Sequence, residues 1–546
     1  MLRILDKPAG LTTHTSLSGE ERKRLDIDPI DSFLGHVSYR SGEVLFPVHR
    51  LDLGTTGVLL AADSREEASE LAAIFESREI EKAYLFLTDR KPRVPAADDG
   101  KPTRVESFID RHSSSGAAQG NSNFFSIPSS AENPTNAITD FSLVSFEENY
   151  SLWRARPLTG RPHQIRLHAA ELGLHILGDT EHGGTSFPAL CLHANEIKLK
   201  FRNENIAAES PPPKWFSLSE KFDERWGFTL VGWLAAVDRR ERLARSLATF
   251  NIAETQTKRM IHSDGGDLRA DQLGSIVQLH WYGTEFDDID RDAVKELTSI
   301  MAWNNWYLQT RPNRGKSPTE AQMIVAGENV PTRWQASEES ASYSFRRDTS
   351  MSAGLFLDQR ANRRWVSSTA KGRKVLNLFS YTGGFSLVAA LAGAEKVVSV
   401  DLSKNFINWS KENFELNALR VDDSRFEFRA MEAFDYLRWA KKKEIRFDLV
   451  ICDPPSFSRS ENGAFRIEKE LENLWQACAD VTNEGGRIIF ALNYEMMSES
   501  EFFARAETWA AINKRRLTVE RTPSADLDFE FPREARAMKS LFFKFV

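Results

Sequence analysis

The chain has 546 residues, of which 41% are hydrophobic and 27% are charged, and only three are cysteines. This composition excludes a disordered or fibrous chain, and the length predicts about three globular domains. The isolated cysteines exclude a disulfide framework and a zinc ribbon, and the longest apolar run, near residues 228–237, is too short to cross a bilayer.

Charge and the start of the chain bear on its partners and location. The formal net charge is −7, which argues mildly against a nucleic-acid-binding protein, although net charge averages over all faces. Local basic groups exist, such as the arginines between 239 and 245, and each is either a solvated helix face or a track for RNA. Because no cleavable leader opens the sequence, we expect a cytoplasmic protein with no membrane partner.

Residues 48–57 organise the first half of the chain. They read Val-His-Arg-Leu-Asp-Leu-Gly-Thr-Thr-Gly, with one apolar run before them and another after them. This pattern predicts a strand, a tight turn and a second strand. Asp52 and Arg50 would then lie on a loop held by a rigid scaffold, where catalytic groups are often found. An ion pair that only stabilises the turn is the alternative.

Five segments of this half resemble, in the same order, the motifs of the RluA family of pseudouridine synthases. The central one is His-Arg-Leu-Asp followed by Thr-Thr-Gly, and the resemblance covers residues 1–220. It implies an α+β domain built on a mixed antiparallel sheet with flanking helices. The other four segments are Leu5–Leu11, Glu81–Tyr84, Leu158–His168 and Leu192–Ala194.

The resemblance implies a reaction and the residues that carry it. Such an enzyme extrudes a uridine from RNA and isomerises it to pseudouridine without a metal or an organic cofactor. Asp52 would be the nucleophile, and Arg50 would fill the space that the base leaves. Tyr84 would stack on the uracil, and Arg166 would pair with Asp52 and keep it ionised.

Other features of this half are expected to be scaffold. The family uses neither His163 nor His168, so a metal-binding or acid–base role for them is disfavoured. Periodicity, capping pattern and composition predict one helix, one long mobile loop and two strands. These elements are expected at 64–75, 111–136, 137–146 and 150–157.

Three prolines at 211–213 mark a boundary, because successive prolines exclude a helix. Residues 226–345 then form an accessory region that could bind RNA and weakly resembles the accessory domain of some rRNA base methyltransferases. Its aromatic side chains Trp303, Trp306 and Tyr307 could stack on bases, but a place in the core is favoured. We expect strands at 228–235 and 276–282, and helices at 238–249 and 292–306.

The last part of the chain alternates buried strands with helices. A glycine turn at 380–384 follows the first strand, and Asp401 ends the second, about 20 residues past the glycines. An acidic residue there is placed to bind ribose hydroxyls, although a glycine turn alone could equally mean a dinucleotide enzyme. The strands are expected at 375–379, 396–400, 426–430, 447–452 and 485–493, and the first helix at 385–394.

Asp-Pro-Pro-Ser-Phe at 453–457, after the fourth strand, resembles motif IV of class I S-adenosylmethionine-dependent methyltransferases that act on bases. The Asn-Leu-Phe-x-Tyr-Thr-Gly-Gly-Phe turn, and Phe-Leu-Asp-Gln-Arg at 356–360, are closer to large-subunit rRNA base methyltransferases. The resemblance implies a Rossmann-like α/β domain over 346–546 that uses S-adenosylmethionine. A rigid turn that only ends the strand is the alternative for the two prolines.

The resemblance also assigns roles in this second domain. Asp401 would hold the cofactor ribose, and Glu432 would lie near the adenine amine. Asp453 would serve catalysis at the junction of cofactor and base. Phe379, Tyr381, Thr382 and Gly383 would line the methionine end of the cofactor, Asp358 and Arg360 would close its pocket, and Pro454, Pro455 and Phe457 would face the flipped base, with Phe457 stacking on it.

The positions of the cysteines limit which atom can accept the methyl group. Carbon-5 methylation of cytosine uses a cysteine thiolate, but Ser456 follows the two prolines and the end of the fifth strand also lacks cysteine. Cys452 and Cys478 are expected in the core. A base nitrogen is therefore preferred, and guanine N7 or N2 is favoured because residues 526–544 resemble the guanine-modifying relatives more closely.

The sequence thus predicts a bifunctional RNA-modifying enzyme, a pseudouridine synthase joined to a methyltransferase that acts on a guanine of 23S rRNA. Ribosomal RNA is the favoured partner, and tRNA is possible. Two alternatives remain: an RNA-binding ribosome assembly factor with one or both sites inactive, and a methyltransferase of a ribosomal protein. The sequence leaves open the target nucleotides, the oligomeric state and any coupling between the sites.

Overall fold

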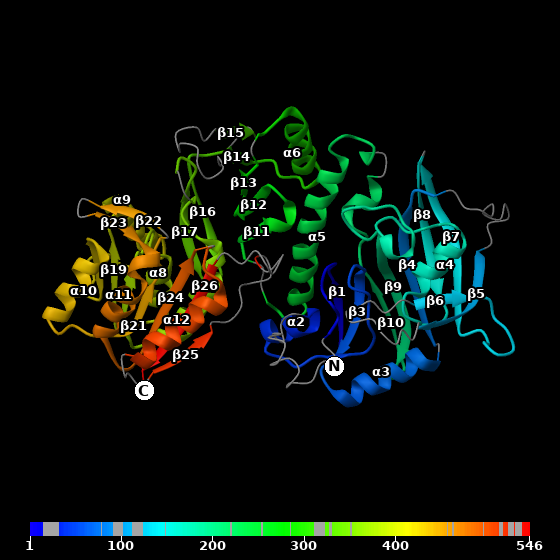
Figure 1. The fold of residues 1–546 in the computed structure, drawn as a ribbon, viewed down its shortest axis with the longest axis horizontal. Coiled ribbons are helices and arrows are strands. Elements are labelled where there is room, and N and C mark those ends of the chain that lie inside the picture. The colour runs from blue at the N-terminus through cyan, green and yellow to red at the C-terminus, as the bar shows by residue number, and fades with distance from the viewer. Residues whose placement is uncertain are drawn as a thin grey trace. The chain divides into compact units, whose positions relative to one another are not determined.

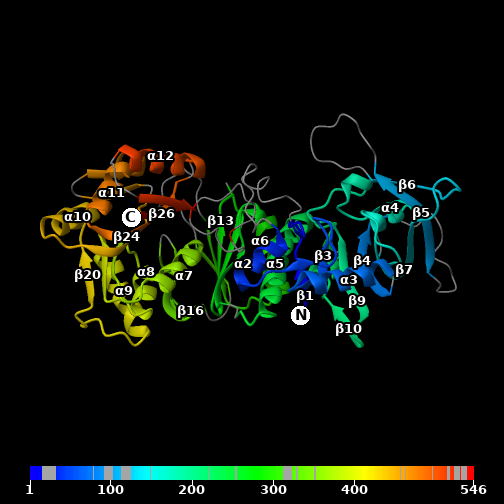
Figure 2. The same cartoon turned by 90° about the horizontal axis from the view of Figure 1, so that it is seen from below.

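The structure, a computed structural model, divides into two compact units (Figures 1 and 2). The first unit comprises Met1–Glu254 and Glu285–Ala302, and the second comprises Thr255–Thr284 and Trp303–Val546. Each unit is described by itself. The structure describes residues 1–14, 32–77, 79–90, 102–111, 124–147, 149–218, 221–252, 255–283, 285–310, 323–326, 330–349, 352–455, 457–460, 463–494, 496–512, 517–521, 529 and 538–545.

A ten-stranded sheet forms the first unit. Its order is β1-β3-β9-β4-β8-β7-β5-β6, with β2 paired to β3 and β10 paired to β9. The pairs are antiparallel except β3 with β9, so the predicted mixed antiparallel sheet is confirmed. The strands are β1 (Leu2–Lys7), β2 (Phe46–Pro47), β3 (Thr56–Ala62), β4 (Ile80–Thr88), β5 (Thr103–Arg111), β6 (Phe124–Ile127), β7 (Ala137–Glu147), β8 (Tyr150–Pro157), β9 (Leu192–Phe201) and β10 (Glu204–Glu209).

Helices flank this sheet at several places. The predicted helix is α3, which buries Ala68 and Leu71 against β3 and β9, and the Ser64 hydroxyl caps it by accepting from the Glu67 N–H. Helix α4 packs Ile165 against β4, β7 and β8. Helix α5 lies along β1 and contacts α6. The helices are α2 (Phe33–Ser41), α3 (Arg65–Ser77), α4 (Gln164–Glu171), α5 (Gly227–Ala248) and α6 (Asp288–Ile300).

Three sequence predictions in this unit were wrong in part. The strand expected at 228–235 is the first half of α5, because its apolar residues recur at helical spacing and a short apolar run does not reveal its period. Within the loop expected at 111–136, residues 124–127 are strand β6 beside β5, and residues 112–123 lie outside the described part. The helix expected at 292–306 ends at Ile300.

The second unit begins with a five-stranded sheet, β11-β12-β13-β14-β15, followed by the hairpin β16–β17. Trp306 and Tyr307 are buried in β14, so these two aromatic side chains belong to the core as favoured. The strands are β11 (Thr257–Ile261), β12 (Leu268–Leu273), β13 (Ile276–Trp281), β14 (Trp306–Thr310), β15 (Met323–Ala326), β16 (Arg333–Glu338) and β17 (Ala341–Arg346).

A seven-stranded sheet, in the order β20-β19-β18-β21-β24-β26-β25, forms the rest of the second unit. The first five of these strands are parallel and β26 is antiparallel to both of its neighbours, which is a doubly wound arrangement. The strands are β18 (Lys374–Leu378), β19 (Lys396–Asp401), β20 (Phe426–Ala430), β21 (Phe447–Cys452), β24 (Thr482–Asn493), β25 (Leu517–Arg521) and β26 (Met538–Phe545); β22 (Phe457–Ser460) and β23 (Gly463–Arg466) form a separate hairpin.

Two layers of helices bury this sheet. Alternate strand residues pack on one face with α10, α11 and α12, and on the other face with α7, α8, α9 and the β16–β17 hairpin. All five predicted strands are therefore confirmed, and so is the Rossmann-like fold. The helices are α7 (Arg360–Thr369), α8 (Gly384–Leu391), α9 (Lys404–Leu416), α10 (Ala433–Lys442), α11 (Ile467–Asp480) and α12 (Glu499–Ile512). Among the described residues of the chain, no helix could span a membrane.

Candidate active sites

The backbone of the Asp52 loop in the first unit is held by hydrogen bonds from Lys7. This side chain is fully buried, and its ammonium donates to the carbonyls of Pro8, Asp52, Leu53 and Thr55 at 3.0–3.2 Å. Gly57, the second residue of β3 after the loop, has φ +114°, and a Cβ there would collide with the backbone of β9. The loop is therefore fixed at its backbone, while the Asp52 side chain keeps 28% of its surface exposed.

Arg166 lies beside the Asp52 carboxylate. Its Nη1 is 3.7 Å from Asp52 Oδ2, and its other face donates to Asp179 at 2.5 and 2.8 Å and to Glu181 at 2.8 Å. Hydrogen bonds to these carboxylates and the charge of Asp52 raise the pKa of Arg166 against the effect of its burial. The guanidinium is thus a permanent charge held rigidly at the candidate nucleophile.

The other two predicted residues of this site differ in their setting. Tyr84 lies on β4, and burial and the negative charge of Asp52 raise the pKa of its phenol, so it stays a neutral ring near the carboxylate. Arg50 is exposed on the segment that leads into the loop. The structure therefore brings Asp52, Arg166 and Tyr84 together and leaves Arg50 at the surface.

His168 and His163 lie in different surroundings. His168 is fully buried between the hydroxyls of Ser107 and Thr139, each at 2.8 Å, and burial lowers its pKa to about 4. His163 lies with Glu181 and His182 in a group whose ligand atoms could reach one metal ion. Arg166 already donates to Glu181 and lies 3.2 Å from His163 Nε2, so a guanidinium charge occupies the place beside this group.

In the second unit, the loop after β18 has an unusual backbone. Phe379 and Tyr381 hold positive φ angles of 53° and 49°, which side chains other than glycine rarely adopt. Gly383 also has positive φ, and a Cβ there would collide with the side chain of Ser410. Asn413 donates to the Thr382 carbonyl at 2.9 Å, so side chains of α9 support the strained loop.

Asp401 joins this loop to the end of β19. Its carboxylate accepts from the backbone N–H of Tyr381 and of Ser403, both at 2.8 Å. Burial raises the pKa of Asp401, and the two N–H donors oppose that rise. Glu432 follows β20 and caps α10 by accepting from the Asp435 N–H at 3.0 Å.

Asp453 directly follows β21, the neighbour of β18 on its other side. The loops after β18, β19, β20 and β21 meet at the carboxyl ends of parallel strands, where the strand order reverses and where such sheets bind ligands. Burial and the nearby Asp358 raise the pKa of Asp453 to about 7, although Gln359 donates to its Oδ2 at 2.8 Å. A carboxyl group close to half ionisation at neutral pH is typical of functional sites.

The remaining residues predicted for the methyltransferase site fall into two groups. Some are buried in contacts with other residues, and others lie outside the described part of the chain. Arg360 is buried and pairs with Glu338, which also binds Arg363, so it lies in a buried ion-pair cluster. Pro454 is buried and Pro455 is half-buried. Ser456, the side chain of Phe457 and most of residues 526–544 lie outside the described part of the chain. Sequence reasoning missed Gln359, whose position beside Asp358 and Arg360 was its only signal.

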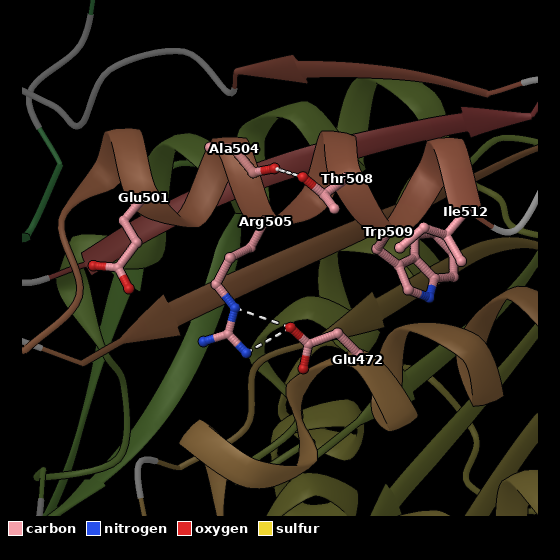
Figure 3. A pocket seen from close by; sticks show the side chains of 7 residues that line it. All are labelled: Glu472, Glu501, Ala504, Arg505, Thr508, Trp509 and Ile512. Atoms are coloured by element: carbon pink, nitrogen blue, oxygen red, sulfur yellow. Dashed lines mark hydrogen bonds and ion pairs between the residues drawn. The ribbon is translucent and has the colours of Figure 1, made fainter.

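A pocket lies between α11 and α12 (Figure 3). Arg505 on α12 donates to Glu472 on α11 at 2.5 and 2.9 Å across it. The lining residues are Glu472, Glu501, Ala504, Arg505, Thr508, Trp509 and Ile512. None of them belongs to the loops that carry Thr382, Asp401 or Asp453.

Comparison with known families gives a matching family model for each of the two units. Residues 263–544 match the family model described as S-adenosylmethionine-dependent methyltransferase. The chain belongs to this methyltransferase family. Residues 2–171 match the model described as RNA pseudouridylate synthase, so the predicted combination of the two families in one chain is confirmed. S-adenosylmethionine is accordingly the cofactor of the methyltransferase region.

Two curated relatives carry the names of ribosomal RNA methyltransferases. A putative ribosomal RNA large subunit methyltransferase, YwbD of Bacillus subtilis, is 30% identical over 260 residues, which are 46% of this chain and 65% of the relative. The ribosomal RNA large subunit methyltransferase K/L of Shewanella pealeana is 39% identical over 194 residues, 35% of this chain and 26% of the relative. The chain thus spans less than two thirds of these curated relatives. A solved structure of a putative SAM-dependent methyltransferase from Streptococcus mutans covers 64% of this chain and 87% of its own, with 24% identity and a TM-score of 0.49.

Proposed function

We propose that the chain modifies RNA twice, isomerising a uridine to pseudouridine in its first unit and methylating a base in its second. The pairing of Asp52 with Arg166 at 3.7 Å carries the first half of this proposal. The meeting of the strained loop, Asp401 and Asp453 at one sheet edge carries the second. The printed names of the relatives favour ribosomal RNA as the substrate, with tRNA as the other candidate.

In the first unit, Asp52 acts as the nucleophile on an extruded uridine. Splitting the rearrangement into two steps through a covalent adduct lowers the barrier of each step. Arg166 directs the Asp52 carboxylate, because its other donors are already committed to Asp179 and Glu181 and hold the guanidinium in place. Tyr84 offers a neutral ring for stacking, and the exposed Arg50 takes the place of the base in the RNA stack.

In the second unit, the residues at the strand ends bind the cofactor and the base so that the acceptor atom faces the methyl group. S-adenosylmethionine supplies the methyl group when it is bound. Asp401 fixes the loop around Tyr381 and offers its carboxylate edge to ribose hydroxyls, while Glu432 stands at the next strand end for the adenine. Asp453 and the prolines after it face the base and orient its acceptor atom, with Phe457 as the stacking residue, and this positioning accounts for the rate.

The acceptor is a base nitrogen, with guanine N7 or N2 favoured. Carbon-5 methylation would need a cysteine thiolate at the base. The three cysteines of the chain are all buried, and burial raises the pKa of Cys452 well above that of a free thiol. Cys452 therefore remains a protonated core side chain.

The test is nucleoside mass spectrometry on rRNA from a strain that lacks this protein, after incubation with the purified chain. We expect pseudouridine with or without S-adenosylmethionine, and a methylated guanine only when it is present. Asp52→Asn should abolish the first product, and Asp453→Asn the second. Methyl transfer into ribosomal proteins, or no product on rRNA, ribosomal particles or tRNA, would contradict the proposal.

A further inference from the structure

A row of buried side chains leads from β26 to Asp453 within the second unit. The Asn362 amide donates to Ser540 Oγ at 2.8 Å and to Gln359 Oε1 at 2.7 Å, and the Gln359 amide donates to Asp453 Oδ2 at 2.8 Å. Ser540, Asn362 and Gln359 are only 2–6% exposed. We call these three residues the amide relay.

The relay fixes the orientation of the Gln359 side chain. An amide has one acceptor oxygen and one NH2 group with two donors. The Asn362 NH2 group uses its two donors on Ser540 and Gln359, so the Gln359 oxygen must face Asn362. The Gln359 NH2 group then has to face Asp453, where it can only donate.

A fixed donor at Oδ2 favours the form of Asp453 that accepts hydrogen bonds. A protonated carboxyl group would place a hydroxyl on one of its oxygens, and a proton on Oδ2 would face the Gln359 N–H. The groups around Asp453 have opposing effects on its pKa. Burial and Asp358 raise the pKa of Asp453, Arg363 lowers it, and the thiol of Cys452 stays protonated.

We propose that Gln359, oriented by Asn362, is a positioning residue that keeps Asp453 a hydrogen-bond acceptor toward the methyl-accepting base. This proposal rests on the proposed methyltransferase function. Oδ2 is held by the relay, so Oδ1 is the oxygen that remains for a donor on the base. A relay that starts on β26 and passes through α7 also ties the direction of this carboxylate to the packed core rather than to its own loop.

The test is the pH dependence of RNA methylation in Gln359→Leu, Gln359→Glu and Asn362→Leu. Loss of the Gln359 donor should move the acid limb of the rate profile upward by about one pH unit, with a plateau near the wild-type rate at high pH. Gln359→Glu adds a carboxyl group at Asp453 and should move the limb further. Asn362→Leu should move it less, because Gln359 remains but can turn over.

Asn417→Ala is the matched control. This amide donates to the backbone carbonyls of Ser342 and Asn413, and none of its described hydrogen bonds involves Asp453 or the amide relay. It should lower stability and leave the acid limb in place. An unmoved limb in Gln359→Leu, or a rate that falls equally at every pH, would overturn the positioning role.

A second measurement separates this proposal from the function on which it rests. If the wild-type chain methylates no RNA, the proposed function fails, but the titration of Asp453 can still be followed by stability. The unfolding free energy of the wild type relative to Asp453→Asn should fall as the pH rises toward about 7, because the folded pKa of Asp453 lies above its unfolded value. Repeating the pair in Gln359→Leu should move the end of this fall to higher pH. The same end point in both backgrounds would exclude the relay.

Discussion

One buried side chain, Lys7, carries much of the local order at the Asp52 loop. Lys7 is fully enclosed and donates to four carbonyls around the Asp52 loop, and its burial lowers its pKa to about 7 against the opposing effect of the Asp52 charge. Lys7→Met would leave these carbonyls unpaired, and we expect a loss of roughly 2–3 kcal/mol in denaturant unfolding. Lys200→Met, at an exposed position of β9, should change stability by less than about 0.5 kcal/mol. Equal effects of the two substitutions would contradict this role of Lys7.

His168 should make the first unit sensitive to acid. Its folded pKa of about 4 lies below the ordinary histidine value of 6.5, so the unfolded chain binds more protons between these two values. Stability should therefore be complete above about pH 6.5 and fall by up to roughly 3 kcal/mol as the pH drops to 4. His168→Asn should make this dependence measurably shallower in unfolding experiments carried out across the range, because the His168 share of it is removed. A slope as steep as that of the wild type would assign the acid sensitivity to His49 or His193 instead, which are also buried with lowered pKa values.

At the scale of elements, α5 is part of the first unit through a buried ion-pair cluster. Arg242 on α5 is fully buried and pairs with Asp6 of β1 and Asp238, each at 2.6 Å, while Arg245 binds Asp6 from a position that is 40% exposed. Arg242→Met should cost roughly 3–5 kcal/mol, because it leaves the buried Asp238 without its cation and Asp6 with only the part-exposed Arg245. Arg245→Met is the control and should cost about 1 kcal/mol or less. Similar losses from both would show that the cluster does not anchor the helix.

Helices and strands could be predicted from the sequence where the order of apolar and polar residues fits only one type of secondary structure. The parallel strands β18, β19 and β21 are mostly apolar runs between helices, β20 alternates apolar and charged residues, and all four lie where the pattern placed them. The apolar start of α5 has no such context, so it was assigned as a strand. The Asp52 and Asp453 loops were found because their residues are adjacent in sequence. Gln359 and Asp453 are 94 residues apart, and no local pattern records their hydrogen bond.

For the whole molecule, the two proposed sites should be chemically independent. The described contacts of Asp52 come from Lys7, Thr55, Tyr84 and Arg166 of the first unit, and those of Asp453 come from residues 358–363 and Cys452 of the second. A substitution at one carboxylate therefore removes no contact of the other.

We accordingly expect opposite losses from the two substitutions in the same chain. Asp52→Asn should lower pseudouridine formation by more than about a thousandfold and leave the methylation rate within twofold of the wild type. Asp453→Asn should do the reverse, with both products counted in the same RNA by mass spectrometry. If Asp52→Asn also slows methylation on unmodified RNA but not on RNA that already contains pseudouridine, the second reaction recognises the product of the first. The two units would then act in a fixed order on one substrate.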